Sequence, residues 1–106
     1  GLSVVQGSAD VALGIPFDVA EYGAFLRMMA QVNNMKPAML DYHLVDAHIY
    51  MNQIDNMKEL MKRDAKPEPK LIITSTPKSI FDFKRQDFEL EGYDPHPAMK
   101  DIPVAL

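Results

Sequence analysis

Three polar side chains occupy every second position of one alternating segment. Asp46, His48 and Tyr50 stand at i, i+2 and i+4, so in a β-strand they point to the same face. An imidazole beside a phenol suits a sugar hydroxyl, because both groups can donate or accept a hydrogen bond. A satisfied buried network that holds the core is the simpler explanation, and the three residues alone favour it. A metal site ranks lowest, because no third ligand has a suitable spacing.

Further polar candidates lie near a predicted helix start. Asp18 follows a turn at Gly14 and Pro16, where a carboxylate that caps the helix or complements its dipole is the simpler explanation. Ser8 and Asp10 flank an earlier turn, and turn chemistry explains them equally well. Residue types and spacing therefore indicate an α/β (α+β) protein with a candidate polar site on one strand.

A long apolar helix and an alternating strand must position these groups. Residues 16–34 carry Asp18 and Glu21 near their start, and beyond them only Arg27, Gln31 and Asn34 form a clear polar line, which predicts a mostly buried helix. Residues 38–50 alternate throughout, which predicts one continuous strand. The other expected elements are strands at 2–6, 70–73 and 88–91, a helix at 51–63 with one solvent-exposed face, and an extended tail at 93–106.

Composition narrows the class of protein. The 106 residues fit one domain or a piece of one, and 47% of them are hydrophobic. The net charge of −4 without a basic run argues against nucleic-acid binding. The absence of cysteine excludes disulfides, thiolate metal sites and a thiol nucleophile within this chain. No apolar run approaches the roughly 20 residues that span a bilayer, and no signal peptide is visible, so the default expectation is a cytoplasmic protein without membrane contact.

Five blocks of sequence follow one another in a familiar order: QGSAD at 6–10, LGIPFDVAEY at 13–22, DAHIY at 46–50, DFELEGYDPHP at 87–97 and PVAL at 103–106. In order and spacing they resemble the C-terminal part of thymidylate synthase. The resemblance implies that residues 1–106 are the C-terminal portion of such a domain, without the N-terminal half that carries the catalytic cysteine. It also implies a partial three-layer fold, in which a mixed sheet is packed by the long buried helix.

The resemblance further implies an activity. Thymidylate synthases are obligate homodimeric methyltransferases of nucleotide biosynthesis, which convert deoxyuridylate to thymidylate with 5,10-methylenetetrahydrofolate as co-substrate. A cysteine adds to C6 of the pyrimidine, and the folate then delivers the carbon to C5. This chain has no catalytic residue of that kind, so we expect it to supply binding residues for the nucleotide and the folate and to be inactive by itself. The sheet would form the dimer interface, and the isolated chain would expose apolar surface.

Individual site residues follow from the same resemblance. Ser8 would bind the phosphate, His48 and Tyr50 the deoxyribose 3′-hydroxyl, and Asp10 the folate pterin, while the end at 104–106 would close over the ligands. The residues implied for the nucleotide are Gln6, Ser8, Asp10, Asp18, His48 and Tyr50, and those implied for the folate are Asp10, Leu13, Gly14, Phe17, Tyr50, Val104 and Ala105.

Three departures from the family pattern keep other functions open. Gly7 stands where the family has an arginine, so a bidentate phosphate contact is lost. Asp18 stands where the family has an asparagine that reads uracil, and a carboxyl suits cytosine, as in the related deoxycytidylate hydroxymethylases. Leu44 and Val45 replace a small pair and would crowd the pyrimidine pocket. With the missing cysteine, Gly7 also allows a non-catalytic binding or assembly module.

Overall fold

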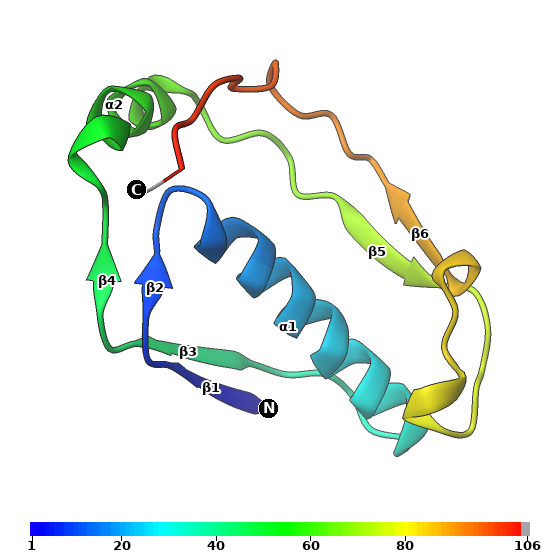
Figure 1. Cartoon of the computed structure of the whole chain (residues 1–106). Coiled ribbons are helices and arrows are strands. Elements are labelled where there is room, and N and C mark those ends of the chain that lie inside the picture. The colour runs from blue at the N-terminus through cyan, green and yellow to red at the C-terminus, as the bar shows by residue number, and fades with distance from the viewer. Residues whose placement is uncertain (105–106) are drawn as a thin grey trace.

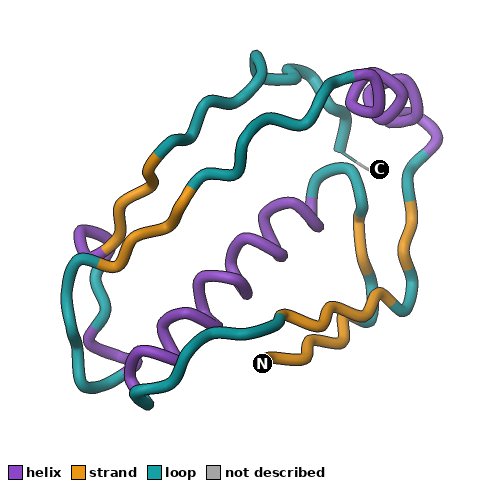
Figure 2. The backbone as a smooth tube through the Cα atoms, turned by 180° about the vertical axis from the view of Figure 1, so that it is seen from behind, coloured by secondary structure: helices purple, strands orange, loops and turns teal. Residues whose placement is uncertain are grey.

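Three small β-ladders surround one long helix in a computed structural model of the chain, which describes residues 1–104 (Figure 1). The two views agree that α1 crosses the opening of a ring made by the rest of the chain (Figure 2). The strands are β1 (Leu2–Gln6), β2 (Ala9–Asp10), β3 (Leu40–Leu44), β4 (Ala47–His48), β5 (Lys70–Ile73) and β6 (Phe88–Glu91), and the α-helices are α1 (Gly14–Val32) and α2 (Ile54–Lys62).

The parallel pair β1–β3 carries one face toward α1. Val4 pairs with Tyr42 and Gln6 with Leu44 in the ladder, and the burial of β1 alternates between half-buried and exposed residues. The half-buried face includes Gln6 and Tyr42, while Val5 on the opposite face is 70% exposed. The period of two in the sequence therefore survives as one face against the helix and one open face.

The predicted continuous strand at 38–50 is wrong, because the chain bends between β3 and β4. Val45 N–H still donates to Gln6 O at 3.0 Å, but Ala9 N–H then donates to Asp46 O at 2.9 Å, so the next ladder starts on new partners. The segment between β1 and β2 bends at the same level, at Gly7 and the residue after it. The strands β2 and β4 then continue together as a second parallel pair. The strict alternation that placed Asp46 on the face of His48 is lost at this corner.

The polar line of α1 attaches the helix to the second half of the chain. Gln31 Nε2 donates to Ser75 O at 2.7 Å, and Arg27 Nη1 donates to Leu71 O. The helix ends as the sequence predicts: Asn34 has a left-handed φ of 53°, and Met35 N–H donates to Ala30 O at 2.7 Å.

The expectation that α1 is mostly buried is wrong for this chain. Ala30 is the helix residue that is fully buried, whereas Phe17 is 76% exposed and Phe25 38% exposed. The physical reason is that β2, β3 and the turn at Ile80–Asp82 contact α1 over only part of its surface and leave its remaining apolar surface exposed to solvent. The fully buried apolar residues in the described part of the chain are Ala9, Ala12 and Ala30.

The dimensions of the chain agree with this open arrangement. The radius of gyration is 16.1 Å, whereas a compact domain of this length has about 13 Å. The accessible surface is 8312 Å², whereas a compact monomer of this mass exposes about 6,000 Å². The chain therefore exposes much apolar surface, as expected from the sequence.

The second half of the chain follows the predicted elements closely. A 3₁₀ turn at Met51–Gln53 leads into α2, and β5 pairs with β6 in an antiparallel ladder. Gly92 ends β6 with a φ of +73°. The segment 94–104 then returns along α2 without regular structure, and ends near the start of α1 (Figure 1). Across residues 1–104, no helix is long and apolar enough to cross a membrane.

Candidate functional site

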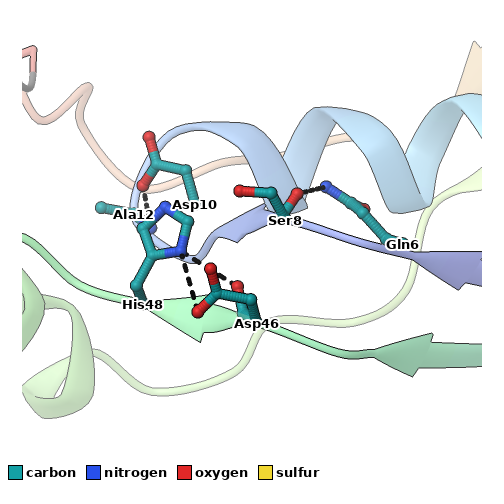
Figure 3. A network of polar contacts seen from close by, with 6 residues as sticks. All are labelled: Gln6, Ser8, Asp10, Ala12, Asp46 and His48. Carbon is teal, nitrogen blue, oxygen red and sulfur yellow. Dashed lines mark hydrogen bonds and ion pairs between the residues drawn. The ribbon is translucent and has the colours of Figure 1, made fainter.

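An amide at the end of β1 joins three elements. Gln6 Nε2 donates to Asp18 Oδ2 on α1 at 3.0 Å and to Ser8 O at 2.8 Å (Figure 3 shows the bond to Ser8). The hydroxyl of Tyr42 on β3 donates to Gln6 Oε1. Because Oε1 already accepts from the phenol, the amide group must turn its donor side to Asp18. The network thus orients the carboxylate of Asp18 from the neighbouring ladder.

This network borders a cavity of about 340 Å³ between the β1–β3 ladder and α1. Gln6, Gly7, Asp18 and Tyr42 line it, and the ring of Tyr22 meets that of Tyr42 edge-on at 5.9 Å between centroids. Desolvation of the phenol and, next, the Asp18 carboxylate raise the pKa of Tyr42 above its ordinary value. Tyr42 therefore stays protonated at neutral pH and remains a donor to the amide.

A second group of polar side chains lies on the β2–β4 ladder. Asp10 and His48 are direct partners in the parallel register, so their side chains leave the ladder on the same side (Figure 3). Asp10 Oδ1 accepts from Ala12 N–H at 3.2 Å, which is the turn bond that the simpler explanation predicts. Within residues 1–104, no hydrogen bond involves the other carboxylate oxygen of Asp10.

His48 is held by its own segment. Its Nδ1 lies 3.0 Å from Asp46 O and 3.9 Å from Asp46 Oδ1 (Figure 3). Since the carbonyl only accepts, Nδ1 carries the proton, and Nε2 of the neutral ring is an acceptor. The rings of His48 and Tyr50 meet edge-on at 5.2 Å between centroids. The pair is adjacent as the sequence predicts, whereas Asp46, which is 70% exposed, orients the imidazole instead of sharing its face.

The start of α1 brings the two groups together. A Cβ built on Gly14 would lie 3.5 Å from Asp10 Cβ and 3.4 Å from Asp18 Oδ2, so the two acidic side chains flank this glycine. The N-cap residue Leu13 makes no side-chain cap. Asp18 bonds to Gln6 rather than to the helix end, which contradicts its simpler explanation as a capping carboxylate.

Other predicted site residues are spread over open surface. Ser8 is exposed, and its carbonyl rather than its hydroxyl enters the network. Leu13 is half-buried, whereas Phe17 is 76% and Val104 72% exposed. Ala105 lies outside the described residues. The structure therefore unites Gln6 with Asp18 and His48 with Tyr50, and of the residues implied for folate it places Asp10 beside Gly14 at the helix start.

The sequence patterns missed two polar residues of this region. Tyr42 looked like one member of an apolar strand face, although a phenol among apolar residues signals the need for a partner. Gln53 is fully buried, and its amide joins Tyr50 to Pro103. A glutamine beside an apolar helix stripe is a weak sign of burial, and no sequence pattern identifies a partner 50 positions away.

The fold and the site define an α+β protein in which an amide, carboxylates and a histidine–tyrosine pair converge at a helix start. A family model described as thymidylate synthase matches residues 1–105. The chain belongs to the thymidylate synthase family, which confirms the resemblance seen in its sequence blocks. At the level of the family this is a methyltransferase that uses nucleotide and folate substrates, with methylenetetrahydrofolate as the carbon donor.

Proposed function

We propose that this chain supplies the nucleotide- and folate-binding residues of a thymidylate synthase-type enzyme, which methylates deoxyuridylate to thymidylate with 5,10-methylenetetrahydrofolate. The observation that carries the proposal is the meeting of two polar groups at the start of α1. Gln6 bonds to Asp18, Asp10 pairs with His48, and Gly14 lies between the two carboxylates. The amide of Gln6 and the carboxylate of Asp18 line a cavity, and the imidazole and phenol of His48 and Tyr50 lie on the neighbouring strand segment; these groups suit a deoxynucleotide, which offers hydroxyl, amide and carbonyl groups.

His48 and Tyr50 would bind the deoxyribose 3′-hydroxyl. The bond from Nδ1 to Asp46 O leaves His48 Nε2 free to accept the proton of that hydroxyl. The phenol of Tyr50, in edge contact with the imidazole, would donate to the same oxygen. In this proposal both partners of one hydroxyl would be in place before the nucleotide arrives, which would lower the ordering cost of binding.

Asp18 would read the pyrimidine edge. Gln6 occupies its Oδ2, and among residues 1–104 no protein donor reaches its Oδ1. A carboxylate oxygen accepts from the 4-amino group of cytosine but faces the O4 acceptor of uracil. This observation favours a second candidate substrate, deoxycytidylate, for an enzyme of the deoxycytidylate hydroxymethylase type.

The folate would lie on the open side of the helix start. Asp10 would hold the pterin with its second carboxylate oxygen, and Leu13 and Gly14 would form the adjacent wall. The exposed ring of Phe17 offers an apolar face to the cofactor. Tyr50 would contact the other edge of the folate, and the closing end at 104–106, of which Ala105 lies outside the described residues, would cover it. The residues present suit a ligand with a polar ring and an apolar linker.

The catalytic step needs a cysteine that this chain does not contain. The proposal therefore includes an N-terminal half that carries the nucleophile and completes the three-layer fold, and a second copy that covers the outer face of β1 and β3. The exposed apolar surface supports both additions. A cytoplasmic location belongs to the same proposal.

Gly7 supports the alternative of a non-catalytic binding or assembly module. Its missing side chain removes a phosphate ligand, and a Cβ at this position meets nothing within 4 Å. Among residues 1–104, no side chain occupies the space beside Gly7, so nothing there replaces the phosphate contact of the family's arginine. The two alternatives differ in one respect: for a non-catalytic module, no added N-terminal half restores turnover, and recovered activity would rule the module out.

Titration calorimetry tests the proposal. We expect deoxyuridylate or deoxycytidylate to bind the 106-residue chain, and a folate to raise the affinity for the preferred nucleotide. Tyr50→Phe should weaken nucleotide binding about tenfold by removing one donor. Tyr93→Phe, in which an exposed phenol is removed from the tail, is the matched control and should bind normally. Equal binding by both variants would overturn the assigned role of Tyr50.

A further inference from the structure

Gln53 is the buried polar side chain with the most distant partners. It is fully buried, and it lies in the 3₁₀ turn between β4 and α2. Its Oε1 accepts from Tyr50 N–H at 3.2 Å, and its Nε2 donates to Pro103 O at 2.9 Å. Its own backbone N–H donates to Tyr50 O at 2.9 Å. One residue therefore bonds to both backbone groups of Tyr50 and to the segment 94–104.

Only an amide satisfies both partners of Gln53. Tyr50 N–H is a donor and Pro103 C=O an acceptor, so the side chain must present an oxygen to the first and an N–H to the second. The reversed amide would face donor with donor and acceptor with acceptor. Because Gln53 is buried, losing either hydrogen bond would leave a polar group with no hydrogen-bond partner from protein or water, which is destabilising. The arrangement is thus specific for glutamine in one orientation.

Among the described residues, the other side-chain hydrogen bonds and ion pairs of the segment 94–104 lie at its other end and are exposed. Lys66 pairs with Asp94 at 3.4 Å, and Arg63 Nη1 donates to Pro97 O at 2.8 Å. His96 Nε2 lies 2.7 Å from Asp64 O. Exposed contacts of this kind hold weakly. Within residues 1–104, the bond from Gln53 is the side-chain hydrogen bond that reaches the segment beyond residue 97.

We propose that Gln53 is a positioning residue that fixes Pro103 beside Tyr50, so that the end of the segment 94–104 and the His48–Tyr50 pair move as one unit. This placement needs no ligand. Its consequence for ligands rests on the proposed function, in which Tyr50 and Val104 both contact folate: a ligand that orders one of them then orders the other.

Amide hydrogen exchange and NMR of the 106-residue chain without ligand test this placement. In the wild-type chain we expect slowly exchanging side-chain amide protons on Gln53, with a nuclear Overhauser contact to Pro103. In Gln53→Leu the exchange of Tyr50 N–H should become about tenfold faster, because one hydrogen bond is lost. The resonances of Ile102 and Val104 should shift and sharpen, because the segment gains motion.

Two further variants separate positioning from general stability. Gln53→Glu keeps an acceptor for Tyr50 N–H but turns an oxygen toward Pro103 O, so it should release Val104 while Tyr50 stays protected. Gln31→Leu removes a comparable bond to Ser75 O at the far end of α1 and should change neither residue. Unchanged Ile102 and Val104 signals in both Gln53 variants would overturn the proposal. If a variant fails to fold, the wild-type chain still provides a test, because a rapidly exchanging Gln53 side-chain amide would overturn the proposal as well. Loss of nucleotide binding would bear on the proposed function alone.

Discussion

Replacing Asp18 by asparagine should shift the base preference of the chain toward deoxyuridylate. Gln6 Nε2 holds Asp18 Oδ2 at 3.0 Å, and the amide oxygen of an asparagine at this position would accept the same bond. The new NH₂ group then takes the place of the oxygen that faces the base. A donor at this place pairs with O4 of uracil and repels the 4-amino group of cytosine.

The size of the shift follows from the number of hydrogen bonds that change. A good two-bond contact to a base discriminates by about 1–3 kcal/mol, or roughly five- to 150-fold. Since Gln6 occupies one oxygen of Asp18, the substitution changes only one contact with the base, which becomes unfavourable for cytosine and favourable for uracil. We therefore expect the ratio of dissociation constants for deoxycytidylate and deoxyuridylate to rise about tenfold, in the lower part of that range.

Calorimetry with both nucleotides on wild type and Asp18→Asn measures this ratio. Both nucleotides carry the same phosphate, so the loss of one negative charge cancels in the ratio. Asp41→Asn is the matched control: it removes the same charge from an exposed position on the other face of β3. An unchanged ratio in a variant that still binds would refute the role of Asp18, and so would an equal shift in Asp41→Asn.

Three further predictions concern the phosphate, the network and the folate. Gly7→Arg should raise nucleotide affinity about tenfold at low salt and lose most of that gain at high salt, because a Cβ at this position meets nothing within 4 Å and a guanidinium can pair with phosphate; Ser3→Arg, which adds the same charge to an exposed position of β1 that does not line the cavity, should not. The folded chain holds the Tyr42 proton more tightly than the unfolded chain, so stability to urea should fall as pH rises from the ordinary tyrosine pKa of about 10 through the raised value, and Tyr42→Phe should remove this dependence. Phe17→Ser should change stability by less than about 0.5 kcal/mol, because the ring is exposed, yet weaken folate binding in calorimetry; Phe81→Ser, at an even more exposed ring, should leave folate binding unchanged.

Local signals in the sequence predicted most elements. The apolar run 70–73 follows prolines and forms β5 with the expected bounds, and Asn34 ends α1 because asparagine tolerates a left-handed φ. The alternation at 38–50 misled because a bend at 45–46 keeps the residue pattern while it changes ladder partners. The exposure of α1 escaped prediction because periodicity records which faces are apolar, not what covers them.

The candidate site was predictable only in part for the same reason. Spacing alone placed His48 next to Tyr50, and sequence blocks suggested Gln6 and Asp18. The bond of Gln6 to Asp18 spans 12 positions, and that of Gln53 to Pro103 spans 50. Such pairs depend on how elements pack, and a single sequence carries no signal for them.

A deoxynucleotide is proposed to bind where β1, β4 and the start of α1 meet, and NMR shift mapping can locate the bound nucleotide. Deoxyuridylate or deoxycytidylate is added to the labelled chain and the backbone amide signals are followed. We expect saturable shifts at Gln6, Asp10, Asp18, His48 and Tyr50, with none along the distant β5–β6 ladder. Absence of shifts at these residues, or shifts confined to β5 and β6, would contradict it.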